Sequence, residues 1–99
     1  MRLCGMDIDI CFEDRSLWAQ NGMGRSSTLD GKILVRNDMP ITVQHSVLIH
    51  EIVHFIADSN NIDLSEGAVN VLAINIHAAL RDNPQIFAQI MAAGSIMRG

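Results

Sequence analysis

Two histidines and a glutamate stand close together in the stretch IHEIVHFI, as the pattern His50-Glu51-x-x-His54. On a helix, residues four positions apart share one face, with about 5–6 Å between their Cβ atoms. His50 and His54 could therefore bind one Zn²⁺ ion, because neutral imidazoles are good zinc ligands. Glu51 would lie about 100° around the helix from His50, beside the ion rather than on it. A general base that acts on a zinc-activated water occupies this position, and the pattern is typical of zinc metalloproteases.

The neighbours of this pattern are apolar on nearly every side of the expected helix, so the helix should lie within the core. A buried charge needs a compensating partner, such as a metal ion or a hydrogen-bond network. The alternative is that the two histidines are ordinary histidines and that the pattern arose by chance. The apolar, central context favours the metal site.

A catalytic zinc site needs a third protein ligand and an open position for water. Asp58 lies two turns beyond His50, roughly 12 Å along the helix axis, which is too far to share an ion. Asn60 stands where some zinc proteases place a third ligand, but its amide binds zinc poorly. Neither residue is therefore favoured.

Glu66 is the third ligand that we favour. It lies twelve residues past His54, at the start of a second expected helix that could fold back against the first. Its competing role is a capping-box carboxylate that reaches back to Asp63. His77 lies roughly 16 Å farther along that helix, so it cannot share an ion with Glu66. Asn70, one turn past Glu66, could support the site by a hydrogen bond or belong with His77 to a solvated stripe, and His77 could stabilise an oxyanion.

The first third of the chain predicts the strands beside this helix. Alternating apolar residues predict a half-buried strand over Met6–Phe12, and a loop should follow over 15–24. Asp30-Gly31 predicts a hairpin turn before a strand over 32–36. We therefore expect a small antiparallel β-sheet of about three strands.

The period of the apolar residues then changes to that of helices. One helix should run from about 39 to 58, with Asp38 or Thr42 as its cap. A second should run from about 63 to 83 and a short third over about 84–91. Two to three helices packed on a small sheet make the class α+β.

Composition narrows the class of protein further. A chain of 99 residues that is 48% apolar is expected to form a single globular domain, residues 1–99. Its formal net charge of −4 argues against a nucleic-acid partner. No stretch is long and apolar enough to predict a membrane span. Cys4 and Cys11 should point to opposite faces of a strand, so neither a disulfide nor a shared metal is expected. Two free thiols fit a reducing compartment, and we therefore expect a cytoplasmic protein.

The string HEIVHFI, followed by SEGAVNVLA and ALRDNP, resembles small zinc metallopeptidases of phages and prophages, related to the ImmA/IrrE-like peptidases. The resemblance covers about residues 28–90 and implies a minimal zincin-like fold. It implies zinc ligands at His50, His54 and Glu66 and a catalytic base at Glu51. It also implies that the strand over 32–36 borders the cleft and pairs with an extended substrate. If the protein is phage-encoded, the expected location is the host cytoplasm.

Two functions follow from these observations. The first is a zinc-dependent metallopeptidase that hydrolyses a cytosolic protein or peptide, and an intact Glu51 favours it. The second is a zincin-like module that binds a host or phage protein without turnover. The small size favours the second, as does the absence of tyrosine, whose oxyanion role would fall to His77, His45 or Arg36.

The C-terminal segment predicts self-association. It carries more apolar residues than a small monomer usually exposes, and large apolar patches usually mark interfaces. These residues are Ile86, Phe87, Ile90, Met91 and Met97. A homodimer is therefore the expected assembly, unless the segment simply closes the core.

Overall fold

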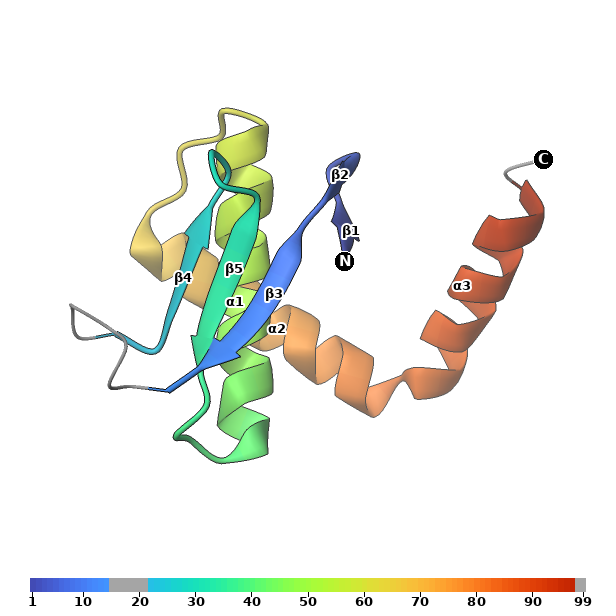
Figure 1. Ribbon diagram of the computed structural model, residues 1–99. Coiled ribbons are helices and arrows are strands. Elements are labelled where there is room, and N and C mark those ends of the chain that lie inside the picture. Colours follow the sequence, from blue (N-terminus) through green and yellow to red (C-terminus); the bar gives the residue numbers. More distant parts are fainter. Residues whose placement is uncertain (15–21, 98–99) are drawn as a thin grey trace.

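Five short strands precede three helices in the computed structural model, which describes residues 1–14 and 22–97 (Figure 1). The elements are β1 (Arg2–Leu3), β2 (Met6–Asp7), β3 (Asp9–Glu13), β4 (Gly24–Ser27), β5 (Lys32–Arg36), α1 (Ile41–Ser59), α2 (Glu66–Asp82) and α3 (Pro84–Met97). The sheets come first and the helices follow, which confirms the α+β class. The predicted loop over 15–24 lies outside the described residues up to position 21, and Gly24 already belongs to β4.

The main sheet has three strands in the order β3-β5-β4. Strands β4 and β5 form the predicted antiparallel hairpin, and Gly31 adopts a φ of 63°, which glycine tolerates without strain. Strand β3, however, pairs with β5 in parallel, Asp9 opposite Lys32 and Glu13 opposite Arg36. The sheet is therefore mixed, and the expectation of a purely antiparallel sheet was wrong. The cause is strand order, because β4 lies at the edge instead of between β3 and β5.

Strands β1 and β2 form a separate antiparallel hairpin at the N-terminus. Cys4 and Gly5 make its turn with positive φ angles of 53° and 76°. Ile8, between this hairpin and β3, is 2% exposed and joins the core beneath α1. The predicted single strand over Met6–Phe12 is thus divided at Ile8.

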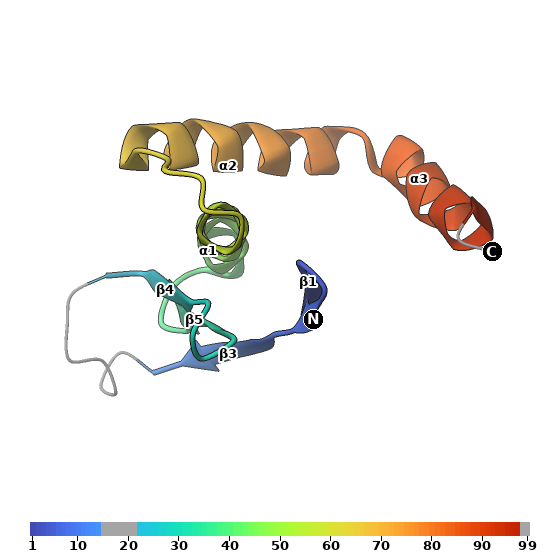
Figure 2. The ribbon, with the colours of Figure 1, turned by 90° about the horizontal axis from the view of Figure 1, so that it is seen from above.

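Helix α1 lies between the sheet and α2, as Figure 2 shows along its axis. On the sheet side, Val47 and Phe55 pack with buried residues of the first third of the chain, namely Ile8, Ile33 and Val35. On the other side, Val53 packs against α2, where it meets Val69 and Ala73. The prediction that this helix is enclosed within the core is confirmed.

The start of α1 differs from the prediction. Pro40 is the N-cap residue and makes no side-chain cap hydrogen bond. Asp38 instead pairs with Arg36 at 2.8 Å, and Thr42 already lies inside the helix. The fixed φ of proline suits a helix start, so a side-chain cap is not required there.

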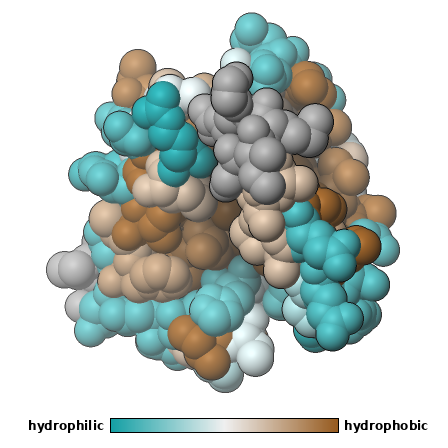
Figure 3. Space-filling model, turned by 90° about the vertical axis from the view of Figure 1, so that its right-hand side faces the viewer, coloured by the Kyte–Doolittle hydropathy of each residue, from teal (hydrophilic) through white to brown (hydrophobic). Residues whose placement is uncertain are grey.

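Helix α3 projects away from the other elements (Figures 1 and 2) and is longer than predicted, since it continues to Met97. The radius of gyration is 14.6 Å, where about 13 Å is typical for this length. Ile86, Ile90 and Met91 are 51%, 58% and 69% exposed. Figure 3 views the molecule from the side on which α3 lies and shows apolar patches among hydrophilic side chains. The side chain of Met97 lies outside the described part. No helix in the described ranges combines the length and the apolarity needed to cross a membrane.

Candidate metal centre

The two histidines of α1 face the first turn of α2. Their ring centroids lie 4.9 Å apart, and their side chains are 21% and 26% exposed. His50 Nε2 lies 2.8 Å from Glu66 Oε1, and His54 Nε2 lies 3.2 Å from Glu66 Oε2. The prediction that His50, His54 and Glu66 come together is therefore confirmed in the structure.

This group could hold a metal ion. All three residues offer ligand atoms that lie within 4.8 Å of one another. Two ligand atoms that are each about 2.0–2.1 Å from a tetrahedral ion lie about 3.3 Å apart. Glu66 Oε1 lies 2.8 Å from His50 Nε2 and 3.3 Å from His54 Nε2, close to that value, so small rotations of the side chains would admit a metal ion. Two imidazoles and one carboxylate also form a donor set that zinc prefers at catalytic sites.

A short, well-defined connection brings Glu66 to the histidines. Asn61 adopts a φ of 56°, which turns the chain after α1, and the Ile62 amide donates to the Ala57 carbonyl at 2.9 Å. Ser65 is the N-cap of α2, and its Oγ accepts a hydrogen bond from the Ala68 amide at 3.1 Å. Glu66 is therefore the first residue of the helix, and its carboxylate contacts the histidines instead of serving a capping box.

The pKa of Glu66 is lowered by its contacts with the two histidines. Hydrogen bonding to His54 is the largest cause, and hydrogen bonding to His50 adds to it. A carboxylate with a lowered pKa stays ionised, as a metal ligand must.

Glu51 points to the other side, toward β4. It is 7% exposed and is the buried charged residue of the described part of the chain. Burial raises its pKa, while the neighbouring histidines His54 and His50, and a hydrogen bond with Ser26, partly offset the rise. A carboxylate with a raised pKa accepts a proton more readily near neutral pH, which suits a general base.

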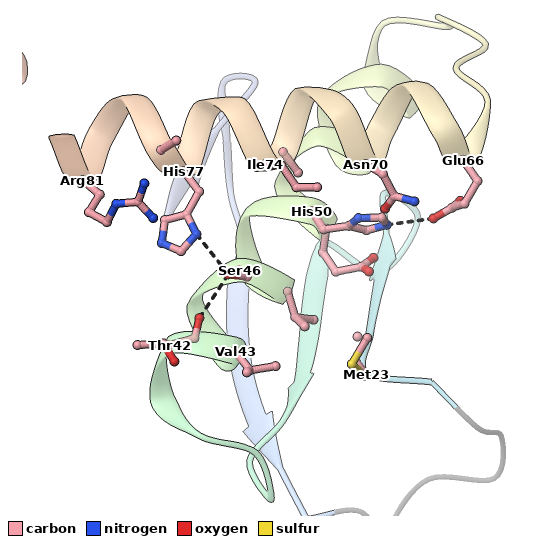
Figure 4. A pocket seen from close by; sticks show the side chains of 15 residues that line it. Met23, Thr42, Val43, Ser46, His50, Glu66, Asn70, Ile74, His77 and Arg81 are labelled. Atoms are coloured by element: carbon pink, nitrogen blue, oxygen red, sulfur yellow. Dashed lines mark hydrogen bonds and ion pairs between the residues drawn. The ribbon is translucent and has the colours of Figure 1, made fainter. Parts of the chain in front are cut away.

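A pocket of about 850 Å³ connects the metal group with Glu51 (Figure 4). It is lined by Met23, Gly24, Thr42, Val43, Ser46, Val47, His50, Glu51, Glu66, Asn70, Ala73, Ile74, His77, Ala78 and Arg81. The pocket lies between α1, α2 and the start of β4. The three candidate ligands thus leave one side of the group open to a ligand-sized space.

Asn70 and His77 both line this pocket, on the α2 face that begins with Glu66 (Figure 4). His77 Nδ1 lies 3.0 Å from Ser46 Oγ on α1. The roles predicted for Asn70 as a supporting residue and for His77 as an oxyanion stabiliser stay predictions.

The other residues considered from the sequence lie elsewhere. Asn60 donates from its amide to the Ile56 carbonyl at 2.8 Å and ends α1, and Asp58 is exposed near the same end. Arg36 contacts Asp38 and the Gly22 carbonyl, and neither Arg36 nor His45 lines the pocket. Of the three substitutes for an oxyanion tyrosine, His77 alone lines it.

Sequence reasoning missed Gly24 and Ser26, which carry β4 across Glu51. A Cβ added at Gly24 would lie 3.2 Å from Glu51 Oε2 and 2.5 Å from Val47 Cγ1. An isolated glycine in a strand can indicate such a close approach, and this was the available signal. Ser46 was missed too, although it lies one turn before His50 on the same helix face.

No protein-family description, curated protein or solved structure matches this chain in the three comparisons.

Proposed function

We propose that this protein is a zinc-dependent peptidase. The observation that carries the proposal is the grouping of His50, His54 and Glu66 at one end of a pocket that also reaches Glu51. The proposed ion is zinc because two imidazoles and a carboxylate are zinc-type donors. The resemblance to small phage and prophage metallopeptidases agrees with this assignment and forms part of the proposal, as does a cytoplasmic location.

In this proposal, one set of residues binds the ion and another residue transfers a proton. His50, His54 and Glu66 would hold zinc, which when bound supplies a Lewis acid that acidifies water and polarises a carbonyl. Glu51 would accept the proton of the attacking water at its carboxylate and return it to the leaving amine. The burial that raises the Glu51 pKa also keeps the carboxylate in place, between Ser26 and the two imidazoles.

The peptide substrate would lie along β4. Strand β5, which was expected to border the cleft, is the central strand and pairs with neighbours on both sides. That expectation was wrong, because the hairpin folds with β4 outward. Met23 and Gly24, at the start of β4, line the pocket, so β4 is the sheet edge that an extended peptide would meet.

A binding module without turnover is the second candidate. Two observations favour it: the chain contains no tyrosine, and His77, its closest substitute in the pocket, already contacts Ser46. In this case a protein partner would occupy the same pocket without being cleaved.

The two candidates are separated by metal content and new peptide termini. Native mass spectrometry of the wild type should find one zinc per chain, and His50→Ala should lose it. His45→Ala is the matched control, because His45 is an exposed histidine of the same helix outside the pocket. Full zinc occupancy of the His50 variant would refute the metal site.

The wild type and Glu51→Gln, both loaded with zinc, would then be incubated with cytosolic extracts. Termini produced by the wild type and not by the Glu51 variant support the peptidase. Identical sets of termini, with zinc present in both proteins, support the binding module instead.

A further inference from the structure

The pocket changes charge along its length (Figure 4). Its carboxylates, Glu51 and Glu66, lie at the end with the metal group. Along α2, His77 and Arg81 follow at the far end, where the lining residues of the pocket include no carboxylate. A ligand that spans the pocket therefore meets acidic groups and a metal at one end and basic groups at the other.

His77 is held in place by α1. Ser46 Oγ lies 3.1 Å from the Thr42 carbonyl oxygen and 3.0 Å from His77 Nδ1. Nδ1 is engaged by Ser46, and the other ring nitrogen is directed toward the Arg81 side (Figure 4), where it donates to an anion when it carries a hydrogen. The imidazole is thus oriented rather than free to rotate, which favours a defined role in binding.

Arg81 lies one helical turn beyond His77 on the same face. Its contact with Asp82 uses Nε, at 3.0 Å, and Nη2, at 3.4 Å. A guanidinium has five N–H donors, so this contact leaves donors for a ligand. Side chains on a helix lean toward its N-terminus, and this lean carries the guanidinium toward His77.

The spacing sets the distance from the metal group. His77 lies eleven residues beyond Glu66 on α2, roughly 16 Å along the helix axis. An extended peptide advances about 3.3 Å per residue, so about five residues span this distance. A peptide carboxylate would then reach the basic end when its carrier lies about five residues from the bond at the metal.

We propose that His77 and Arg81 form an anion subsite that selects peptides with a carboxylate about five residues from the bond to be cleaved. This inference rests on the proposed zinc peptidase, whose substrate class it names. The carboxylate would come from an aspartate or glutamate side chain or from the end of the peptide chain.

The test uses peptides that a hydroxamate, a zinc-binding group, fixes at the metal end. Two sets of alanine peptides carry it at the carboxyl or the amino end, with Glu or Gln at each position in turn. A third set, with the hydroxamate at the amino end, stops after five residues as a free acid or an amide. Calorimetric titration of the zinc-loaded protein measures each Kd, and acetohydroxamate alone measures binding to the metal site.

In at least one set, the carboxylate at about the fifth residue should bind about fivefold more tightly than its neutral counterpart. His77→Gln and Arg81→Gln should remove this preference and leave acetohydroxamate binding unchanged. Asp82→Asn should increase the preference, because it releases the two donors that Asp82 occupies. Arg2→Gln is the control, since Arg2 is also exposed and paired with an aspartate, Asp7, but lies outside the pocket.

The sets also identify the source of the carboxylate, because side-chain and terminal acids are compared separately. Equal Kd values for Glu and Gln, and for acid and amide, at every position would overturn the subsite while acetohydroxamate still binds. Absence of acetohydroxamate binding would instead show that the zinc site itself is wrong. The two failures are therefore distinguishable.

Discussion

Replacing Gly24 with alanine should push β4 away from α1 at the point where the strand crosses Glu51. The new Cβ would lie 2.5 Å from Val47 Cγ1 and 3.0 Å from Glu51 Cγ. Carbon atoms in contact ordinarily stand about 3.5–4.0 Å apart. The strand must therefore shift by roughly 1 Å, or the Val47 side chain must leave its rotamer.

The magnitude follows from two opposing effects. Overpacking of a core costs about 1–3 kcal/mol of unfolding free energy. Alanine in place of glycine also restricts the unfolded chain, which returns about 0.4–1 kcal/mol where the backbone conformation is compatible. We expect Gly24→Ala to lower the unfolding free energy by about 1–2 kcal/mol. In a chain of this size that corresponds to a Tm lower by about 5–10 °C.

The assay is urea unfolding with zinc present, combined with zinc content and peptide cleavage. Gly67→Ala is the matched control, because a Cβ there meets nothing nearer than Ser65 Oγ at 3.9 Å. In that helical position alanine should be neutral or stabilise by up to about 1 kcal/mol. Zinc content should be unchanged in Gly24→Ala, since the clash involves no candidate ligand. Cleavage should fall, because Glu51 is displaced from its place beside the imidazoles.

A double-mutant cycle with Val47→Ala isolates the clash. Removing Cγ1 removes the nearest contact, so Gly24→Ala should cost less in the Val47→Ala background than in the wild type. A coupling of about 1 kcal/mol is expected for residues in direct contact. A Gly24→Ala protein as stable and as active as the wild type would refute the close approach of β4, as would strict additivity in the cycle.

Three further predictions follow from the site and the helices. Glu66→Gln should lose zinc affinity by an order of magnitude or more and keep α2 intact by circular dichroism, because Ser65 caps the helix; unchanged affinity would exclude Glu66 as a ligand. With zinc removed by a chelator, the raised pKa of Glu51 means that its ionised form opposes folding. The contribution of this group to the free energy of unfolding is greatest below its pKa in the unfolded chain and declines as pH rises through its pKa in the folded protein. Urea unfolding should therefore find Glu51→Gln more stable than the wild type at pH 7 and nearly equal to it near pH 4. Equal stabilities at pH 7 would contradict the burial argument. The exposed apolar face of α3 should drive self-association, so sedimentation should detect a dimer that Ile90→Asp weakens, whereas a wild-type monomer at high micromolar concentration would exclude it.

The sequence predictions that the structure confirms depend on local patterns of residues. The spacing of His50 and His54 depends only on helical geometry, and the apolar residues around them sufficed to place α1 inside the core. Glu66 required one more step, the return of α2 onto α1. The break after Ser59 made that return predictable, whereas the cap proved to be Ser65 and not Asp63.

The predictions that failed depend on contacts between segments that the local sequence pattern does not specify. Alternation identified the strand segments, but it contains no information on which strand is central, so the parallel β3–β5 pair was missed. Asp38 has the right residue type for a helix cap and is taken by Arg36 instead. The role of Gly24 depends on the path of β4 across α1, and its one local signal, an isolated glycine in a strand, was missed because Gly24 was assigned to the loop over 15–24.

The burial of Glu51 is the feature that a purely structural metal site leaves unexplained. Such a site needs its ligands and gains nothing from a further carboxylate whose ionisation burial opposes. Here the chain encloses that carboxylate with a glycine placed against it and a serine that hydrogen-bonds it. It also leaves the metal group open to a pocket of about 850 Å³, whereas structural zinc sites are closed by a fourth protein ligand. The cost in stability and the open position are both accounted for if Glu51 handles a proton for a substrate in the pocket, so the peptidase remains the better supported of the two functions.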